Sequence, residues 1–370
     1  MKILITGQNG FIGAHLYNTI KYKFPSIDII DFKRDFFDDK EKLDKALSKA
    51  NFIVHLAGIN RHENQELLYS KNLLLSKTIA ESINRINFKG KLVFASSTQE
   101  SLDTNYGKSK KHSNELFLKL SKANKFYYSG LIIPNVFGPF CKSHYNSFIA
   151  TFCSNSIMDI NNEINKNEDV GLIYIDNLIS YIINDLKIQK NESKFVKKDL
   201  TVKVSYVKKL IDSFKNIYLD KGQIPHLNSE FDANLFKTFT SYINHENYFP
   251  RPLNQTADER GVFFETIRSA NKGQYSCSIT FPDQIRGNHF HTRKIERFIV
   301  IQGKALIKMR KIDSNEIVQF EVDGKEPVYV DMPLWYTHNI KNVGDNDLIT
   351  LFWINEFYNK SNTDTFFEKV

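Results

Sequence analysis

The sequence predicts an α/β domain with a doubly wound parallel sheet, followed by a smaller all-β domain of the jelly-roll type. The chain has 370 residues, more than one typical domain. Strand-like apolar runs alternate with helix-like patterns as far as about residue 245, whereas the later strand-like runs are short and separated by turn residues. We therefore expect the α/β domain at residues 1–247, a linker at 248–252 and the β domain at 253–370.

Composition and charge exclude several classes of protein. Apolar residues make up 41% and aromatic residues 13% of the chain, too many for a disordered protein. No apolar run is long enough to span a membrane, and the N-terminal run is too short for a signal peptide, so we expect a cytoplasmic protein. The net charge is +8, but lysines are mixed with acidic residues and form no motif for nucleic acid. A modest positive field instead suits a small ligand that carries phosphate.

The elements expected in the α/β domain follow from the spacing of apolar residues. Helices are expected between the strands, and residues 155–245 are expected to form a cap and the last sheet elements. The expected strands are 2–6, 26–31, 51–56, 91–96 and 128–134, and the expected helices are 11–21, 39–49, 63–85 and 106–123.

The β domain is expected to follow a stiff connector that contains Pro250 and Pro252. Turn signals such as Asp323-Gly324 separate its apolar runs, which is typical of a barrel or sandwich. The expected strands are 274–280, 297–301, 305–310, 317–322, 328–330 and 348–354.

A glycine-rich segment directly follows the first expected strand and opens the first expected helix. It contains Gly7, Gly10, Phe11, Ile12 and Gly13. Such glycines let the backbone approach a pyrophosphate, and the helix N-terminus offers free N–H groups, so we expect a dinucleotide site of the Rossmann type.

The residues after the second strand bear on the choice of nicotinamide cofactor. Asp31 stands where an acid can bind the ribose 2′-hydroxyl of NAD. Lys33 and Arg34 follow it and suit the 2′-phosphate of NADPH, unless they are merely solvated loop charges. We expect NADPH.

An acid/base pair is expected on the fourth helix. Tyr106 and Lys110 are four residues apart, so they share one face of a helix. The lysine charge is expected to lower the pKa of the phenol, which can then donate a proton to a carbonyl oxygen as hydride arrives on carbon. Ser97, at the end of a strand, is placed to bind the same oxygen.

The α/β region resembles the extended short-chain dehydrogenases/reductases that act on nucleotide-sugars. This resemblance implies that Ser97, Tyr106 and Lys110 are catalytic. It also implies cofactor contacts at Leu56, Ala57 and Gly58, and a place near the active site for Asn72, which alternatively lies on a helix surface. The family often has an arginine where this chain has Ile132, so the ion pair that this arginine forms in the family is not expected here. The matching segments are Thr6–Gly13, His55–Gly58, Ser96–Ser97, the Tyr106/Lys110 pair and Asn135–Pro139, with Asn135 approaching the sugar diphosphate.

Metal-ligand residues stand at regular spacing in the β domain. They are His289, His291, Glu296 and His338, and this donor set suits zinc, iron, manganese or nickel. With Gly303 and Asn342 they resemble the two motifs of cupins. Asp283 and Trp335 stand where those motifs have glycine, and neither change removes a ligand.

A second resemblance overlaps the first. Asp258–Glu265 and Arg286–His289 are similar to segments of metal-free sugar epimerases, which implies substrate contacts at Arg260 and Arg286. In those epimerases the histidine equivalent to His289 is the catalytic base. In this chain we favour the role of metal ligand for His289. Tyr336 and an unliganded histidine are both candidates for proton transfer, and we also expect Tyr336 to contact substrate.

The whole chain resembles the CapF-type family of capsular polysaccharide enzymes, and the segment Tyr145–Cys153, with a substrate contact at Asn146, supports this. The resemblance implies C3 epimerisation of a UDP-4-keto-6-deoxy-N-acetylhexosamine in a zinc-bearing cupin. NADPH then reduces the C4 ketone to UDP-2-acetamido-2,6-dideoxy-L-talose, toward UDP-N-acetyl-L-fucosamine for capsule or O-antigen. A homodimer or higher homo-oligomer is also implied.

Two alternatives stay open. The reductase acts alone and the cupin is a structural or dimerisation module, or the chain is a nicotinamide-sensing regulatory or scaffold protein. The intact Tyr106/Lys110 pair argues against a sensor, which needs no proton donor.

Overall fold

The chain folds into two compact units in a computed structural model, and each is described by itself. Unit 1 comprises Met1–Thr151 and Ile164–Tyr206, and unit 2 comprises Phe152–Glu163 and Val207–Val370. The structure describes all residues except 254, 259–260, 265–266, 268–273, 357–358 and 360. Helices α5 (Phe148–Ile157) and α7 (Val204–Phe214) contain two of the three points where the chain passes from one unit to the other, and the third lies between Glu163 and Ile164.

The main sheet of unit 1 is six-stranded and wholly parallel, in the order β2-β1-β3-β4-β5-β8. This is a doubly wound order, with its switch point between β1 and β3. The strands are β1 (Lys2–Thr6), β2 (Asp28–Ile30), β3 (Phe52–His55), β4 (Lys91–Ser97), β5 (Tyr127–Ile133) and β8 (Asn191–Phe195).

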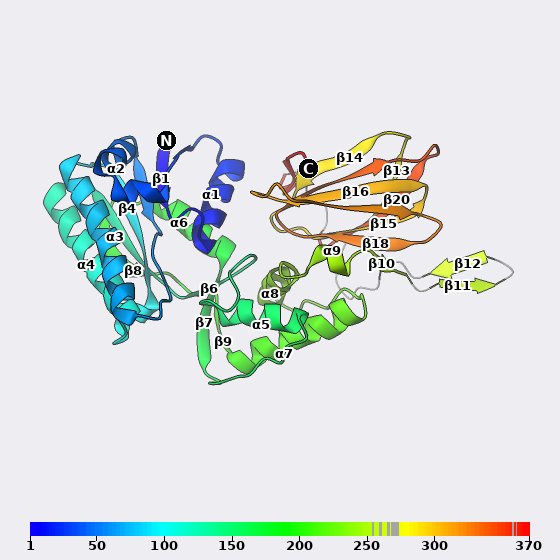
Figure 1. The fold of residues 1–370 in the computed structure, drawn as a ribbon, viewed down its shortest axis with the longest axis horizontal. Coiled ribbons are helices and arrows are strands. Elements are labelled where there is room, and N and C mark those ends of the chain that lie inside the picture. Colours follow the sequence, from blue (N-terminus) through cyan, green and yellow to red (C-terminus); the bar gives the residue numbers. More distant parts are fainter. Residues whose placement is uncertain (254, 259–260, 265–266, 268–273, 357–358, 360) are drawn as a thin grey trace. The chain divides into compact units, whose positions relative to one another are not determined.

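Helices cover both faces of this sheet. Helices α2 to α4 lie on one face, and α1 and α6 pack together on the other (Figure 1). Their bounds are α1 (Phe11–Lys23), α2 (Lys40–Leu47), α3 (Gln65–Arg85), α4 (Asn105–Asn124) and α6 (Ile175–Asp185), with short 3₁₀ turns η1 (Arg34–Asp38) and η2 (Thr98–Ser101). The predicted α/β fold is therefore confirmed, with element ends within a few residues of the expected ones.

Local sequence explains where these helices begin and what they bury. The Asn64 side chain accepts from the first turn of α3, and the Thr104 hydroxyl accepts from Gly107 N in α4. Leu43, Ile79 and Phe117 on three helices are fully buried against the strands. Each such side chain contributes about 1.5–3 kcal/mol by leaving water.

A second, three-stranded sheet of unit 1 comes from the region expected to hold a cap and the last strands. Its order is β6-β7-β9, with β6 (Asn135–Phe137) parallel to β7 (Asp169–Tyr174) and β9 (Leu200–Lys203) antiparallel to it. This sheet begins directly after β5, so it starts at the carboxyl edge of the main sheet.

Unit 2 contains two five-stranded sheets built from antiparallel pairs, as the jelly-roll prediction requires (Figure 1). The orders are β10-β18-β15-β20-β13 and β17-β16-β19-β14-β21. The strands are β10 (Arg251–Pro252), β13 (Gln274–Thr280), β14 (Ile285–Phe290), β15 (Glu296–Gln302), β16 (Lys304–Lys311), β17 (Ile317–Asp323), β18 (Val328–Met332), β19 (Tyr336–Asn342), β20 (Leu348–Ile354) and β21 (Phe366–Phe367), with a separate hairpin of β11 (Gln255–Asp258) and β12 (Gly261–Phe264).

Helical segments precede the sheets of unit 2, and the residues expected to form a linker pack into its core. Phe249 is buried in the cluster that contains Ile299, Ile307 and Val330, and β10 pairs with β18. The helical segments are η3 (Lys215–Asp220, a π-helix), α8 (Glu230–Thr240) and α9 (His245–Tyr248). A folding boundary at residue 247 stays a prediction.

Across the described ranges, no helix combines the length and the apolar character that crossing a membrane requires.

Candidate functional site

The glycine-rich loop of unit 1 lies at the carboxyl edge of the sheet, where β1 ends beside β3. Gly7 has φ +73°, and a Cβ there would lie 2.8 Å from Ala57 N. A Cβ on Gly13 would lie only 2.1 Å from the carbonyl oxygen of Gly7. Both positions therefore require glycine, and α1 begins at the end of this loop with no acidic residue in its first turn. The resulting N–H groups and dipole are open to an anion.

A cleft of about 490 Å³ opens from this loop across the carboxyl ends of the strands. It brings together residues that are far apart in sequence, including the predicted catalytic residues. The predicted site residues that line it are Gly7, Gly10, Phe11, Ile12, Gly13, Leu56, Gly58, Ser97, Tyr106, Lys110, Asn135 and Asn146. Ala57, Asp31, Lys33, Arg34 and Asn72 do not line it.

Asp31 directly follows β2, Lys33 precedes η1 and Arg34 begins it, and all three are exposed. Gln8 ties this segment to the glycine-rich loop, because its Nε2 donates to the carbonyl oxygen of Phe32 at 2.9 Å. The acid and the two cations thus lie on a segment anchored to the dinucleotide loop.

The ammonium of Lys110 is buried and points back to the sheet. Its Nζ donates to the carbonyl oxygen of Ala95 at 2.8 Å and lies 5.8 Å from the centre of the Tyr106 ring. Burial lowers the pKa of Lys110 to about 8. The lysine therefore remains mostly charged at neutral pH.

The predicted lowering of the Tyr106 pKa is wrong for this structure. Burial raises the pKa of Tyr106 to about 12, and the nearby Ser97 hydroxyl opposes this only in part. The Lys110 ammonium donates to the Ala95 carbonyl oxygen and lies 5.8 Å from the centre of the phenol ring. A phenol with a raised pKa stays protonated at neutral pH and is available as a proton donor.

Asn72 is buried, so it does not lie on a helix surface. Its Oδ1 accepts from Ile59 N at 2.8 Å, and its Nδ2 donates to Ile59 O at 2.9 Å. Because it satisfies both main-chain groups of one residue, it fixes the backbone that follows Gly58. Its place is thus beside the cleft rather than in its lining.

Sequence reasoning missed a second set of groups that position the cleft. Thr6 Oγ1 lies 2.7 Å from His55 Nδ1 and accepts from Ala57 N at 3.2 Å. Burial lowers the pKa of His55 to about 3, so this imidazole is neutral. Tyr145 lines the cleft, and its hydroxyl accepts from Asn60 N at 3.2 Å. Both His55 and Tyr145 stand inside family-like segments, which was the only available signal.

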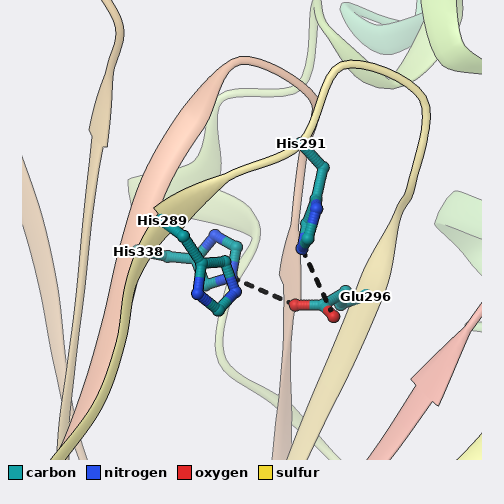
Figure 2. A group of neighbouring side chains, drawn as sticks. All are labelled: His289, His291, Glu296 and His338. Atoms are coloured by element: carbon teal, nitrogen blue, oxygen red, sulfur yellow. Dashed lines mark hydrogen bonds and ion pairs between the residues drawn. The ribbon is translucent and has the colours of Figure 1, made fainter. Parts of the chain in front are cut away.

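The four predicted metal ligands come together in unit 2. One ligand atom from each of His289, His291, Glu296 and His338 lies within 4.8 Å of all the others. Figure 2 shows the three imidazoles facing the Glu296 carboxylate. Strands β14 and β19 pair His289 with His338, and Glu296 begins β15 in the other sheet.

Main-chain carbonyls orient two of these imidazoles. His291 Nδ1 lies 2.5 Å from Asp364 O, and His338 Nδ1 lies 3.1 Å from Tyr336 O. A carbonyl oxygen only accepts, so each Nδ1 carries the hydrogen and each Nε2 is directed at the cluster. The Nε2 atoms lie 3.4 and 3.1 Å from the oxygens of Glu296.

The charges of the cluster suit a cation. Burial opposes ionisation of Glu296, but hydrogen bonds from His291 and His338 outweigh it and hold the carboxyl pKa well below its usual range. Burial and the neighbouring imidazoles lower the pKa of His289 to about 4. An ionised carboxylate beside three nitrogen donors is a suitable ligand set for a divalent transition metal.

The two departures from the cupin motifs retain the backbone conformation of glycine. Asp283 has φ +61° and Trp335 has φ +60°, both in the left-handed region. Trp335 is buried, stacks on Phe290 at 5.6 Å and donates its main-chain N–H to His291 O at 2.9 Å. The turn next to the cluster is thus maintained by packing.

The remaining predicted substrate contacts have mixed positions. The Arg286 guanidinium donates to Thr280 Oγ1 at 3.0 Å and to Ile279 O at 2.9 Å. Tyr336 is half-buried and stands two residues before His338 on the same strand. Arg260 lies outside the described residues, and Asn135 and Asn146 are exposed at the cleft of unit 1.

Fold and sites together define the class of protein, an extended short-chain dehydrogenase/reductase joined to a cupin-like barrel. Residues 3–174 match the NAD dependent epimerase/dehydratase family, and residues 256–366 match the polysaccharide biosynthesis C-terminal domain. RMD from Pseudomonas aeruginosa, solved with NADPH, shares the fold of the first part (16% identity, TM-score 0.51) and covers 58% of this chain and 81% of its own.

Two relatives match the chain over its length. A Pseudomonas aeruginosa UDP-2-acetamido-2,6-beta-L-arabino-hexul-4-ose reductase is 30% identical over 99% of this chain and 98% of its own. The capsular polysaccharide assembling protein CapF from Staphylococcus aureus is 32% identical, covers 100% of both chains and has a TM-score of 0.62. The chain therefore belongs to the CapF-type family of nucleotide-sugar reductases.

Proposed function

We propose that the cleft of unit 1 reduces the C4 ketone of a UDP-linked 4-keto-6-deoxy amino sugar with NADPH. The observation that carries this proposal is the gathering of Ser97, Tyr106 and Lys110 in one cleft with the glycine-rich loop. Membership of the CapF-type family supports the substrate class.

Each of these side chains has a defined task in the reduction. Bound NADPH supplies the hydride. Tyr106 donates its phenolic proton to the ketone oxygen, and Ser97 donates a hydrogen bond to the same oxygen. Lys110 binds the nicotinamide ribose and stabilises the phenolate left after proton transfer. Exposed Lys33 and Arg34 favour NADPH over NADH, because both can pair with a 2′-phosphate.

The cluster of unit 2 is proposed to hold a divalent metal, with zinc as our first candidate. Its fit rests on the buried Nε2 of His291, which is aimed into the cluster with the Glu296 carboxylate 3.4 Å away as the neighbour it faces. A bound metal supplies Lewis acidity for a neighbouring oxygen. The chain's own residues would orient a 4-keto sugar so that its acidified C3 proton is removed on one face and returned on the other.

Together the two sites make a two-step sequence. Epimerisation at C3 in the barrel needs the C4 carbonyl, and the reductase cleft then consumes that carbonyl. The product would be UDP-2-acetamido-2,6-dideoxy-L-talose, made in the cytoplasm for UDP-N-acetyl-L-fucosamine of capsule or O-antigen.

The test is to incubate the enzyme with the UDP-4-keto sugar in D₂O without NADPH and to follow C3 by NMR. Deuterium should enter at C3 before any hydride moves, and the His338→Ala variant should lose this exchange. NADPH oxidation without prior exchange would contradict the epimerase role and leave a reductase alone.

The alternative, a barrel that only dimerises the chain, is favoured by one specific observation. Edge strand β13 and the residue after it expose an apolar stripe, in which Ile279 is 54% and Phe281 is 66% exposed, with Tyr275 and Cys277 on the same face. We propose that a second copy of the chain covers this stripe in a homodimer or larger homo-oligomer. Ile279→Lys should then yield monomer in light scattering, and an unchanged mass would contradict this interface.

A further inference from the structure

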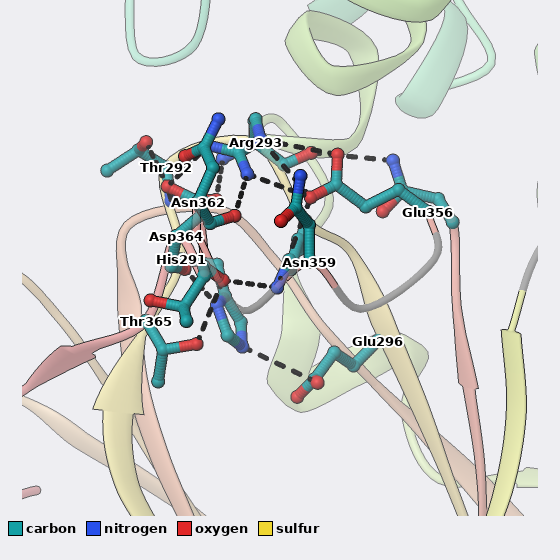
Figure 3. Close-up of polar contacts among 12 residues, drawn as sticks. His291, Thr292, Arg293, Glu296, Glu356, Asn359, Asn362, Asp364 and Thr365 are labelled. Atoms are coloured by element: carbon teal, nitrogen blue, oxygen red, sulfur yellow. Dashed lines mark hydrogen bonds and ion pairs between the residues drawn. The ribbon is translucent and has the colours of Figure 1, made fainter.

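The end of the chain returns to the metal cluster and contacts the turn that carries His291. Figure 3 shows Asn362, Asp364 and Thr365 beside this turn, with Glu296 on the other side of the imidazole. Strand β21 pairs with β14, so the segment is fixed next to His289 and Phe290. Arg293 Nη2 donates to Asn362 O at 2.8 Å, and Lys294 donates to Thr363 O.

Asp364 is the point at which this segment is attached most firmly. Its side chain is 0% exposed, and its backbone has φ +47°. The carboxylate accepts from Arg293 N at 2.8 Å, from Thr292 N at 3.2 Å and from Thr292 Oγ1 at 2.6 Å. A buried carboxylate that satisfies three donors holds the two residues after His291 in one conformation.

The main chain of Asp364 acts directly on the imidazole. Its carbonyl oxygen lies 2.5 Å from His291 Nδ1, so it fixes the tautomer and ring orientation that direct Nε2 at the cluster. The side chain holds the turn and the main chain holds the ring, so one residue sets both the position and the rotation of His291.

We propose that Asp364 is a positioning residue for metal binding, and that it acts through His291 although it is not a ligand. This inference rests on the proposed metal site. It adds a requirement that the ligand motif does not contain, namely that residues 362–367 must be docked beside β14 for full metal affinity.

The experiment is a Co²⁺ titration of the full-length apoprotein, followed by visible absorption, for the wild type, Asp364→Asn and Thr292→Val. Asp364→Asn removes the carboxylate charge and replaces one of its two acceptor oxygens with an NH₂ donor, and we expect a Kd 10- to 100-fold weaker with a changed cobalt spectrum. Thr292→Val removes one of the three donors and should weaken the Kd by a few-fold.

The matched control is Asp283→Asn, the same change at another left-handed aspartate of this unit, whose side chain is 86% exposed. It should leave Co²⁺ affinity and spectrum unchanged. The ¹⁵N shifts of His291 add a second readout, because loss of the Nδ1–H tautomer moves them whereas a general loss of stability does not.

The outcomes separate the two proposals. If the wild type binds Co²⁺ and both Asp364→Asn and Thr292→Val bind it equally well with the same spectrum, the positioning role is wrong and the metal site stands. If Asp364→Asn does not fold, Thr292→Val decides alone. If the wild type itself does not bind Co²⁺ or Zn²⁺, the metal site is wrong, and the role of Asp364 falls with it.

Discussion

The cleft of unit 1 and the cluster of unit 2 are built in different ways. In the cleft, three glycines within seven residues shape the loop, and Tyr106 and Lys110 share one turn of α4. In the cluster, three ligands come from strands of two sheets and His291 lies on the turn after β14, and the support for His291 lies 73 residues further along the chain. Local backbone geometry therefore shapes the dinucleotide loop and the Tyr106/Lys110 pair of the first site, whereas strand pairing and docking of the segment around Asp364 bring the second site together. Changes at the two sites should accordingly be separable.

The largest effect should come from Tyr106→Phe. Loss of the proton donor should lower kcat for NADPH oxidation by about 10²–10⁴-fold, while deuterium exchange at C3 continues. Absorbance of NADPH and NMR of the sugar measure the two activities. Tyr69→Phe, a phenol on α3 that does not line the cleft, should change neither activity. Loss of exchange in Tyr106→Phe would mean that the two activities are not separable.

Trp335→Ala should affect the other site alone. Removing this buried ring leaves a left-handed residue without its packing, and we expect a loss of about 3–5 kcal/mol of unfolding free energy in unit 2. Chemical denaturation measures the loss, and NADPH affinity should stay at the wild-type value. Asp283→Gly, at an exposed position with the same backbone conformation, should be neutral or stabilising by up to about 1 kcal/mol.

Gly13→Ala should weaken NADPH binding without affecting the cluster. The new methyl group would overlap the carbonyl oxygen of Gly7, and such overpacking costs about 1–3 kcal/mol, or roughly 5- to 150-fold in Kd. Fluorescence titration measures the Kd. Gly10→Ala is the matched control, because its Cβ would lie 3.2 Å from the same oxygen and should cost less. Equal losses in both variants would contradict this account of the loop.

The smallest effect should be a pH dependence of cofactor affinity. Burial lowers the pKa of Lys110 to about 8. The side chain therefore carries its positive charge below that pH and loses the charge as the pH rises through it. If only the charged form binds NADPH, the Kd at pH 9 should be about tenfold weaker than at pH 7. Lys110→Arg keeps its charge and should abolish the dependence. A flat profile in the wild type would show that the ammonium does not contribute.

The sequence predicted the main elements because apolar periodicity is a local property. Every strand expected in the parallel sheet formed, and the four ligands met because they follow a fixed spacing. The raised pKa of Tyr106 was not predicted, since it depends on how deeply α4 packs against β4. Asn72, Thr6 and Asp364 act through main-chain groups of other segments. No spacing in a sequence reports such contacts, which exist only once the chain is folded.

The left-handed backbone at Asp283 and Trp335 has a consequence for how this family is recognised. A consensus that demands glycine at these two positions penalises this chain twice, although the torsion angle that the turn needs is present at both. What the turn requires at these positions is a positive backbone torsion angle φ, and glycine is only the residue that adopts this angle most readily. Searches that score backbone conformation alongside residue type should recover barrels that a letter-based pattern leaves out.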